Sequence, residues 1–223
     1  MNYEDWSEFY LRICAEFRYD PSMDAKAADL LSTLLKGCRI FDYRNIAGRM
    51  CLITGPKLDP ERDDHPGSYD WTVVADSALP AYYSTYGRPG IIFTDLDGDV
   101  DLIKRCNREG TVCVIHAHGD NMDKIREHVP DFRSNVIGTC QSAPFGNLLN
   151  FGGFTDGDRA AFFMDTLGFD TIDLIGFDFE TPVLKKGQDP EQKRKKLQWA
   201  RELLRYLSEK RGVDFREGYR IRI

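Results

Sequence analysis

The sequence is poor in the residues and patterns that mark several large protein classes. It has only four histidines in 223 residues, and its six cysteines are scattered with no CxxC pair. Cysteines that lie in apolar runs, as Cys51 and Cys113 do, behave as small hydrophobic residues. The cysteine pattern therefore argues against a disulfide scaffold and predicts a reduced, cytoplasmic protein.

Membrane segments and common nucleotide-binding motifs are also missing. No apolar stretch approaches the roughly 18 residues that a membrane helix needs, and the start of the chain, MNYEDW, has neither the charge nor the apolar run of a signal peptide. The formal net charge of −6 argues against a general nucleic-acid binder. Neither GxxxxGK(S/T) nor GxGxxG is present. We expect no membrane and no nucleic acid among the partners.

The charge is distributed unevenly along the chain. Residues 185–211 contain ten Lys or Arg and four Asp or Glu, a local balance of +6, so the remainder carries −12. A basic segment beside an acidic site is a plausible arrangement for holding a polyphosphate together with a metal ion. A second charged stretch, residues 57–70, is predicted to be a solvated insertion or a mobile lid.

Residues 1–48 are predicted to form an N-terminal helical subdomain. Trp6, Tyr10 and Ile13 recur at helical spacing, and a second helix is expected from Pro21 to Gly37. This segment shows no motif that carries chemistry, and its aromatic residues indicate packing. A homodimer built on these helices is a further expectation.

Residues 49–223 are predicted to form an α/β catalytic domain. Short apolar runs alternate with helical stretches, and each run ends in a Gly- or Asp-rich turn. This alternation is typical of a Rossmann-like, mostly parallel sheet with flanking helices. A long basic helix from Pro190 to about Lys210 and a final strand over 219–223 complete the domain. The predicted strands are 50–54, 71–75, 91–94, 111–115, 135–139 and 171–175.

Three carboxylates follow the strand at 91–94. Asp95, Asp97 and Asp99 point the same way if the extended conformation continues. Carboxylates crowded in this way repel one another unless a cation compensates, and Mg²⁺ prefers oxygen ligands. Two alternatives stay open: an acidic turn that caps the next helix, and the first motif of haloacid-dehalogenase-type phosphatases, with Asp95 as nucleophile and Asp97 as general acid/base. The mid-chain position and the lack of a later paired acidic motif argue against the phosphatase.

The stretch His116-Ala117-His118-Gly119-Asp120-Asn121 resembles the HxHxDH motif of metallo-β-lactamase-fold hydrolases. Asn121 stands where that motif has its last histidine, and no histidine follows His128 to complete a zinc site. His116 or His118 is instead a candidate for hydrogen bonding to a phosphate, with Gly119 allowing close backbone approach. A structural histidine remains the alternative.

A Gly-rich turn at 150–154 enters a helix near Thr155 or Asp156. Backbone N–H groups and the positive end of the helix dipole then face whatever binds there. Asp156 or Asp158 is expected to cap this helix. Arg159 is expected either to pair with Asp158 or to reach a phosphate with its guanidinium group.

Seven stretches occur in an order that closely resembles the archaeal 6-hydroxymethyl-7,8-dihydropterin pyrophosphokinase family. The resemblance covers roughly residues 49–180. The wider family includes motility accessory factors that modify flagellins with sugars, so a non-catalytic, nucleotide-binding glycosylation accessory module is an alternative. The stretches are 55–56, 75–78, 94–98, 116–121, 139–141, 150–159 and 176–179.

Thiamine pyrophosphokinases are similar in outline and provide a further alternative. Their Ala-Asp-Gly-type turn, Asp-x-Asp strand end and Thr-Asp before a helix correspond to Asp76, to Asp95 and Asp97, and to the pair Thr155-Asp156. Ser77 stands where such turns often carry Gly. Both families transfer a pyrophosphoryl group from ATP to a primary hydroxyl, so this similarity supports the reaction more than the acceptor.

The resemblance implies that ATP and Mg²⁺ bind over the strand ends and that the pterin's hydroxymethyl oxygen attacks the β-phosphorus, releasing AMP for pterin-cofactor synthesis. It implies Asp95 and Asp97 as the primary Mg²⁺ ligands, Asp76 and Asp156 as secondary ones, and His118 or Asp120 as the group that orients or deprotonates the hydroxyl. Phe151 or Phe154 is a candidate for stacking on the pterin. The candidates for binding the nucleotide are Gly55, Asp76, Asn150, Gly152, Gly153, Thr155, Asp156, Arg159, Lys193 and Lys196.

Overall fold

A mostly parallel β-sheet forms the centre of the molecule. The computed structural model describes residues 1–62, 66–184 and 187–223, and within them the sheet has nine strands in the order β1-β6-β5-β4-β3-β2-β8-β9, with β7 paired to β6. All the pairings are parallel except that of β8 with β9. The strands are β1 (Arg39–Ile40), β2 (Met50–Thr54), β3 (Trp71–Ala75), β4 (Ile91–Thr94), β5 (Val112–Ala117), β6 (Ser134–Cys140), β7 (Leu148–Leu149), β8 (Thr171–Ile175) and β9 (Arg220–Arg222).

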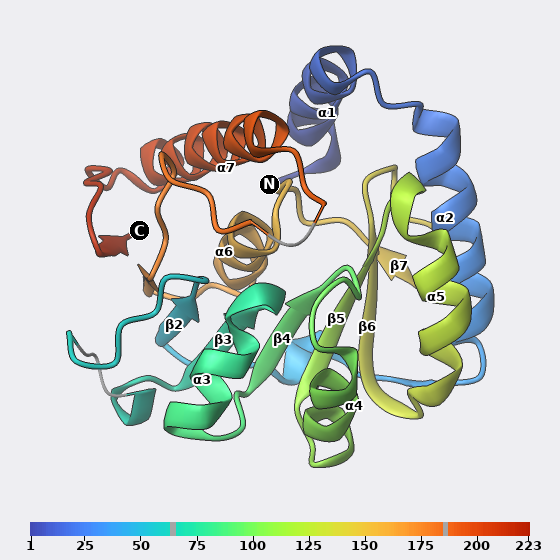
Figure 1. The fold of residues 1–223 in the computed structure, drawn as a ribbon, viewed down its shortest axis with the longest axis horizontal. Helices are drawn as coiled ribbons and strands as arrows, with labels where there is room; N and C mark the ends of the chain where they lie inside the picture. Colours follow the sequence, from blue (N-terminus) through green and yellow to red (C-terminus); the bar gives the residue numbers. More distant parts are fainter. Residues whose placement is uncertain (63–65, 185–186) are drawn as a thin grey trace.

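Helices cover both faces of the sheet, and this layering confirms the predicted α/β fold (Figure 1). One hydrophobic core joins the sheet to α1, α6 and α7, and the other joins it to α2, α3, α4 and α5. Figure 1 shows α2 lying alongside α5 at one side of the molecule. The helices are α1 (Tyr3–Phe17), α2 (Pro21–Leu35), α3 (Leu79–Tyr86), α4 (Val100–Arg108), α5 (Met122–His128), α6 (Asp156–Thr166) and α7 (Pro190–Arg211).

The central strands are apolar along their whole length because both of their faces are covered. In β4, Ile91 and Phe93 enter one core while Ile92 enters the other, and all three are buried. A two-sided burial of this kind needs a continuous apolar run rather than alternation. The sequence therefore marks the central strands clearly.

The predicted N-terminal helices are confirmed, and each packs on a different face of the sheet. Trp6 and Ile13 of α1 lie in one core, and Leu31 and Leu35 of α2 lie in the other. Asn2 and Asp20 cap the two helices with their side chains. The division into a subdomain 1–48 and a catalytic domain 49–223 stays a prediction, since the two segments share both cores.

The predicted bounds match the observed ones for β2, β3, β4 and β8. The bounds of β5 and β6 differ from the prediction, and β5 is extended where polar residues pair. β5 continues through His116 to Ala117 because His116 and Ala117 pair with Thr139 and Cys140 of β6. The two-residue strands β1 and β7 were not predicted, since so short a run carries no periodicity. The C-terminal helix and the final strand are confirmed within one or two residues.

The ends of the charged stretch 57–70 are tied to the body of the protein. Asp70 accepts hydrogen bonds from the backbone N–H groups of Arg49 and Met50, at 2.7 and 2.9 Å. The backbone N–H of Asp59 donates to the Tyr219 hydroxyl at 2.8 Å. Residues 63–65 of this stretch, like 185–186 of the basic segment, lie outside the described residues. Among the helices that the structure describes, none is both long and apolar enough to cross a membrane.

Candidate active site

The polar residues that follow the parallel strands meet at one edge of the sheet. Asp76 follows β3, Asp95 follows β4, His118 follows β5, and Asp156 opens α6. Open α/β sheets bind their ligands at this edge. A cavity of ≈ 340 Å³ lies there. The lining residues that the sequence predicted as site residues are Asp76, Asp95, Asp97, His118, Asp120, Thr155, Asp156, Arg159, Lys193 and Lys196.

Three carboxylates converge in this cavity. Asp76, Asp95 and Asp156 each offer an oxygen, and these oxygens lie within 4.8 Å of one another. Asp76 is buried at 1% exposure and accepts a hydrogen bond from the Thr94 hydroxyl. The backbone N–H of Leu96 donates to that same hydroxyl at 2.8 Å, which orients its proton toward Asp76. Thr94, the last residue of β4, thus fixes one member of the carboxylate group.

The chain does not continue extended after β4. Leu96 has a positive φ of 63°, an uncommon backbone conformation for a non-glycine residue, and it turns the chain between Asp95 and Asp97. The prediction that Asp95, Asp97 and Asp99 point the same way is therefore corrected. Asp97 lines the cavity but is absent from the close carboxylate group. Asp99 caps α4 by accepting from the Leu102 N–H at 3.0 Å, so the capping alternative holds for this one carboxylate.

Gly98 allows this turn to pack against Asp76. A Cβ atom at position 98 would lie 1.6 Å from Asp76 Oδ1. Only a residue without a side chain leaves room for the carboxylate in its observed position. Gly98 is therefore a structural requirement of the carboxylate group.

The crowding of these carboxylates changes their protonation. Burial, together with the neighbouring Asp95 charge, raises the pKa of Asp156 well above the usual range of a carboxyl group. Burial also opposes ionisation of Asp95, but its contacts with His118 and Asp97 and the charge of Arg159 outweigh the burial and lower its pKa. A cation between these groups relieves their repulsion.

The donor set fits a magnesium ion. Asp95 Oδ1 is buried and accepts no hydrogen bond within residues 1–62, 66–184 and 187–223. A buried carboxylate oxygen without a donor costs free energy unless a ligand supplies the missing partner. The three side chains offer oxygen atoms only, and Mg²⁺ prefers such ligands together with substrate phosphates.

His118 and His116 differ in their surroundings. His118 Nε2 lies 3.3 Å from Asp95 Oδ2, and its Nδ1 accepts from the backbone N–H of Asp120 at 3.3 Å. In a neutral His118 the proton therefore sits on Nε2, facing Asp95. His116 is buried within β5, and its Nδ1 lies 2.9 Å from the Thr139 hydroxyl. Burial and the charge of Arg159 lower the pKa of His116 well below its usual range, which keeps it neutral.

The first turn of α6 brings a cation next to the carboxylates. Asp158 accepts from the backbone N–H groups of Phe154 and Thr155, at 2.7 and 2.8 Å, in a capping box with Thr155. The N-cap residue is therefore Thr155 rather than the predicted Asp156 or Asp158, and Asp158 takes part as its reciprocal partner in the capping box. The Arg159 guanidinium donates to Asp156 Oδ1 at 3.3 Å, so its carboxylate partner is Asp156 rather than the expected Asp158.

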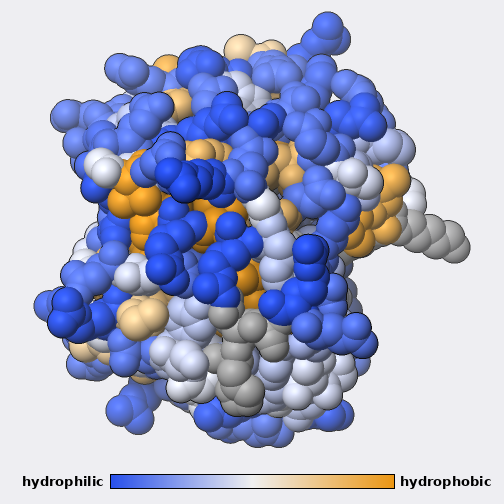
Figure 2. Space-filling model, turned by 90° about the vertical axis from the view of Figure 1, so that its left-hand side faces the viewer, coloured by the Kyte–Doolittle hydropathy of each residue, from blue (hydrophilic) through white to orange (hydrophobic). Residues whose placement is uncertain are grey.

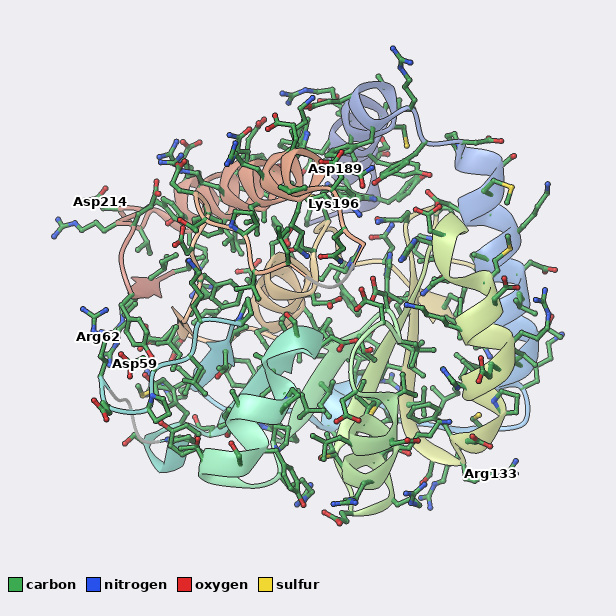
Figure 3. All side chains as sticks on the ribbon, viewed as in Figure 1. Asp59, Arg62, Arg133, Asp189, Lys196 and Asp214 are labelled. Atoms are coloured by element: carbon green, nitrogen blue, oxygen red, sulfur yellow. The ribbon has the colours of Figure 1, made fainter. Side chains whose placement is uncertain are left out.

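Two lysines of α7 face the same cavity. Lys193 and Lys196 line it from the N-terminal part of the helix, and Figure 3 shows Lys196 on the side of α7 toward the strands. The Lys196 ammonium lies 5.8 Å from the ring centres of both Tyr19 and Phe154. Burial and the neighbouring Lys193 lower the pKa of Lys196. The cavity is therefore lined both by the carboxylate group and by the basic side chains of Arg159, Lys193 and Lys196.

Sequence comparison identifies proteins of the same kind. The sequence profile of a family described as 6-hydroxymethylpterin diphosphokinase MptE-like matches residues 71–183. A relative from Methanocaldococcus jannaschii is 33% identical over 96% of this chain and 99% of its own. The chain belongs to the MptE-like 6-hydroxymethylpterin diphosphokinase family. Relatives from Pyrococcus furiosus and Methanothermobacter thermautotrophicus are 37% and 36% identical, each over 93% of this chain and at least 94% of its own. All three relatives are named 6-hydroxymethyl-7,8-dihydropterin pyrophosphokinase.

Four residues predicted to bind the nucleotide in this member of the family do not line the carboxylate cavity. A Cβ at Gly55 would lie 2.6 Å from the Gly176 carbonyl oxygen, and one at Gly153 would lie 2.6 Å from the Arg159 backbone. Gly152 packs against the Met1 side chain. Asn150 donates from its side chain to the carbonyls of Gln141 and Ser142, at 2.9 Å each. These four residues pack the chain against itself at the observed positions.

The N-terminal helices contribute a wall of the cavity that the sequence did not predict. Asp24 is the one acidic residue on the buried side of α2 in the described chain, and this is the signal that could have marked it. Gln141 lies in the stretch 139–141 that carries the family resemblance, but the sequence assigned it no role in the site. The predicted candidates Gly119 and Phe154 also line the cavity. The lining residues that the sequence did not predict are Tyr10, Ile13, Arg18, Tyr19, Asp20, Met23, Asp24, Ser77 and Gln141.

Other cavities lie on the β2–β8 side of the carboxylates. A cavity of ≈ 100 Å³ shares Ser77, Asp156 and Lys196 with the carboxylate cavity. Phe177 and Phe179 also line it. One of ≈ 380 Å³ is lined by residues such as Lys57 and Tyr219. Figure 2 looks onto that side of the molecule, where hydrophilic side chains dominate and apolar ones gather in patches.

Proposed function

We propose that the protein transfers pyrophosphate from ATP to the hydroxymethyl group of 6-hydroxymethyl-7,8-dihydropterin, with Mg²⁺, and releases AMP. The observation that carries this proposal is the set of three carboxylates with oxygens within 4.8 Å, in a cavity that Arg159 and two lysines also line. Family membership supports it, because the three relatives carry the name of this enzyme.

Different residues of the cavity are assigned to metal binding and to charge neutralisation during the transfer. Asp76, Asp95 and Asp156 would hold Mg²⁺, which supplies positive charge to the phosphate oxygens of ATP. Asp97, on the same wall, is assigned to water molecules around that ion. Arg159, Lys193 and Lys196 are assigned to neutralising the charge that develops on the transferred group. The N-terminal end of α6 adds its positive dipole.

The transfer needs one proton to be removed. The hydroxymethyl oxygen forms a bond to the β-phosphorus while the bond from that phosphorus to the α,β-bridging oxygen breaks, and AMP leaves with the bridging oxygen. We assign the released proton to Asp120, whose exposed carboxylate lines the cavity. His118 is less suited as a base, because its Nδ1 lone pair already accepts the Asp120 N–H and its Nε2 faces Asp95. His118 is therefore assigned to positioning Asp95.

One assay tests the proposal directly. The protein is incubated with ATP, Mg²⁺ and 6-hydroxymethyl-7,8-dihydropterin, and the nucleotides and pterins are separated by chromatography. AMP and a diphosphorylated pterin in equal amounts are expected. ADP or inorganic phosphate as the nucleotide-derived product would contradict the proposal, as would thiamine diphosphate formation at a higher rate when thiamine is the acceptor.

We further infer a cytoplasmic enzyme that acts on small molecules as a homodimer. All six cysteines are free, which supports a reducing compartment. The exposed Leu11 on α1 supports an interface on the N-terminal helices. Sedimentation equilibrium measures the assembly state, and a Leu11→Asp variant tests the interface.

A further inference from the structure

Gln141 is a buried amide that the fold itself does not use. The residue is only 4% exposed and lines the carboxylate cavity, and its side chain makes no hydrogen bond to a described residue. Its backbone carbonyl, in contrast, accepts from the Trp6 indole and the Asn150 amide, both at 2.9 Å. The backbone is thus anchored while the side chain is left to face the cavity. An amide that is held at a cavity wall and not used by the fold is available to a polar ligand, so the arrangement points to one.

Asp24 presents a carboxylate to the same cavity. It is 8% exposed and accepts from the Tyr10 hydroxyl at 2.5 Å and from the Gly119 backbone N–H at 2.6 Å. One bond to each oxygen leaves each oxygen a further lone pair. The two bonds fix the orientation of the carboxylate, and the Gly119 bond holds α2 to the loop after β5. Asp24 is therefore a rigid acceptor for N–H groups.

Aromatic rings and a cation complete this end of the cavity. Tyr19 and Phe154 line it, and the Lys196 ammonium lies 5.8 Å from the centre of each ring. Burial, followed by the charge of Asp120, raises the pKa of Tyr19 to about 12, so the ring stays neutral. Flat aromatic faces beside fixed polar groups are typical of a site for a planar heterocycle.

Resting on the function proposed above, we propose that Asp24 and Gln141 recognise the ring of the pterin acceptor. The pyrimidine edge of a pterin carries two neighbouring donors, N3–H and the 2-amino group, beside the acceptor C4=O. A carboxylate matches the two donors, and the Gln141 amide N–H matches the carbonyl. The edge of adenine places the acceptor N1 next to its amino group, so N1 would face the Asp24 charge. The adenine of ATP is therefore assigned to the other side of the carboxylates.

The layout of the cavities agrees with this assignment. The cavity lined by Phe177 and Phe179 shares Asp156 and Lys196 with the carboxylate cavity. It lies on the other side of these shared residues from Asp24. A phosphate chain that spans the shared residues would connect a base on that side with an acceptor hydroxyl on the Asp24 side. The two substrates then approach the metal group from opposite directions, as an in-line transfer requires.

Gln141→Leu is the variant that isolates the proposed contact, because the Gln141 side chain makes no bond that the fold needs. We expect its KM for the pterin to rise about ten- to hundredfold, the effect of losing one hydrogen bond to a buried polar group. Its KM for ATP is expected to stay within about twofold. Gln198→Leu, at an exposed position of α7, is the matched control and should behave as wild type. Thermal unfolding checks that each variant is folded.

A second experiment removes the 2-amino group from the ligand rather than a residue from the protein. 6-Hydroxymethyllumazine carries an oxygen in place of that amino group, and wild type should use it at least about tenfold less efficiently. Asp24→Asn, which keeps the size of the side chain and offers an N–H, should reduce this preference. A purely structural role for Asp24 would lower both activities equally and leave the preference unchanged, and that result would overturn the proposal.

Binding without ATP separates this inference from the proposed function. The oxidised, fluorescent 6-hydroxymethylpterin is titrated into wild type and Gln141→Leu. Weaker binding by the variant supports the assignment even if wild type forms no AMP, in which case only the proposed function fails. If wild type transfers pyrophosphate but Gln141→Leu binds and uses the pterin unchanged, or loses affinity for ATP instead, the subsite lies elsewhere.

Discussion

A single added methyl group at position 98 is expected to disable the enzyme by moving Asp76. The Cβ of Gly98→Ala lies 1.6 Å from Asp76 Oδ1, and Cβ atoms do not approach other heavy atoms closer than 3.0 Å. The carboxylate oxygen must therefore move by about 1.4 Å, the difference between the two distances. Asp76 is 1% exposed and hydrogen-bonded to Thr94, so it has little room to move without loss of that bond.

The cost of that movement falls on both stability and metal binding. Overpacking a buried site destabilises a protein by about 1–3 kcal/mol. Mg²⁺ demands near-ideal coordination, and a misplacement of about 1 Å in a catalytic site lowers the rate about a hundredfold. We therefore expect Gly98→Ala to lower kcat/KM about a hundredfold and to need a higher Mg²⁺ concentration for half-maximal rate.

The assay is AMP formation as a function of Mg²⁺ concentration, with calorimetric unfolding measured beside it. Gly37→Ala serves as the control, because a Cβ there meets only Leu34 O at 3.7 Å, which is ordinary van der Waals contact. It should retain wild-type turnover and Mg²⁺ dependence. A folded Gly98→Ala protein with the same Mg²⁺ dependence as wild type would refute the reasoning, because Asp76 would then not hold the metal.

Three further predictions concern the carboxylates, the sheet edge and the pH dependence of stability. Asp95→Asn should abolish Mg²⁺-dependent AMP formation, and Asp97→Asn should lower it less, because Asp97 lies outside the close carboxylate group. Asp173→Asn should lower the free energy of unfolding, measured in urea, by about 1.5–3 kcal/mol, because this fully buried carboxylate accepts charge-assisted hydrogen bonds from the Arg222 side chain of β9. A hydrogen bond from Lys57 lowers the pKa of Asp178 to about 2 from 3.8, so this pair stabilises the fold above pH 4 and the contribution disappears between pH 4 and 2; Lys57→Met should weaken that dependence.

Each of these predictions has a control and an outcome that contradicts it. Equal losses in Asp95→Asn and Asp97→Asn would favour the original pairing of these two as the main ligands. For Asp173, the exposed Asp214→Asn should cost no more than about 1 kcal/mol, and equal costs would show that burial is not the cause. An unchanged slope of stability against pH in Lys57→Met would assign the low Asp178 pKa to its backbone donors, the N–H groups of Thr181 and Glu180.

The sequence predicts where the site lies better than it predicts which residues form it. Central strands such as β4 are continuous apolar runs, and parallel strands bring their carboxyl ends to one edge. Asp76, Asp95 and Asp156 could therefore be placed together without any structure. The left-handed Leu96 could not be foreseen, since leucine has no preference for that conformation. That turn leaves Asp97 outside the close group, and Asp156 enters it from the start of α6.

The glycine-rich turn and the N-terminal helices show why the rest of the site was not predictable. A glycine that permits close approach has the same sequence signal whether a ligand or the chain itself approaches, and Gly153 packs on the Arg159 backbone. Asp24 and Gln141 come from segments more than a hundred residues apart. Their meeting in one cavity depends on how α2 packs on the sheet, which local patterns do not record.

The walls of the cavity come from separate parts of the chain, and this separation has a consequence for how such an enzyme can diversify. The carboxylates stand on strand ends and on α6, whereas Asp24 and Tyr19 stand on or beside the two N-terminal helices. Substitutions on those helices can alter the shape offered to an acceptor while every group assigned to the phosphates keeps its place. Selection for a new acceptor can then act on the two N-terminal helices while the transfer chemistry is inherited unchanged.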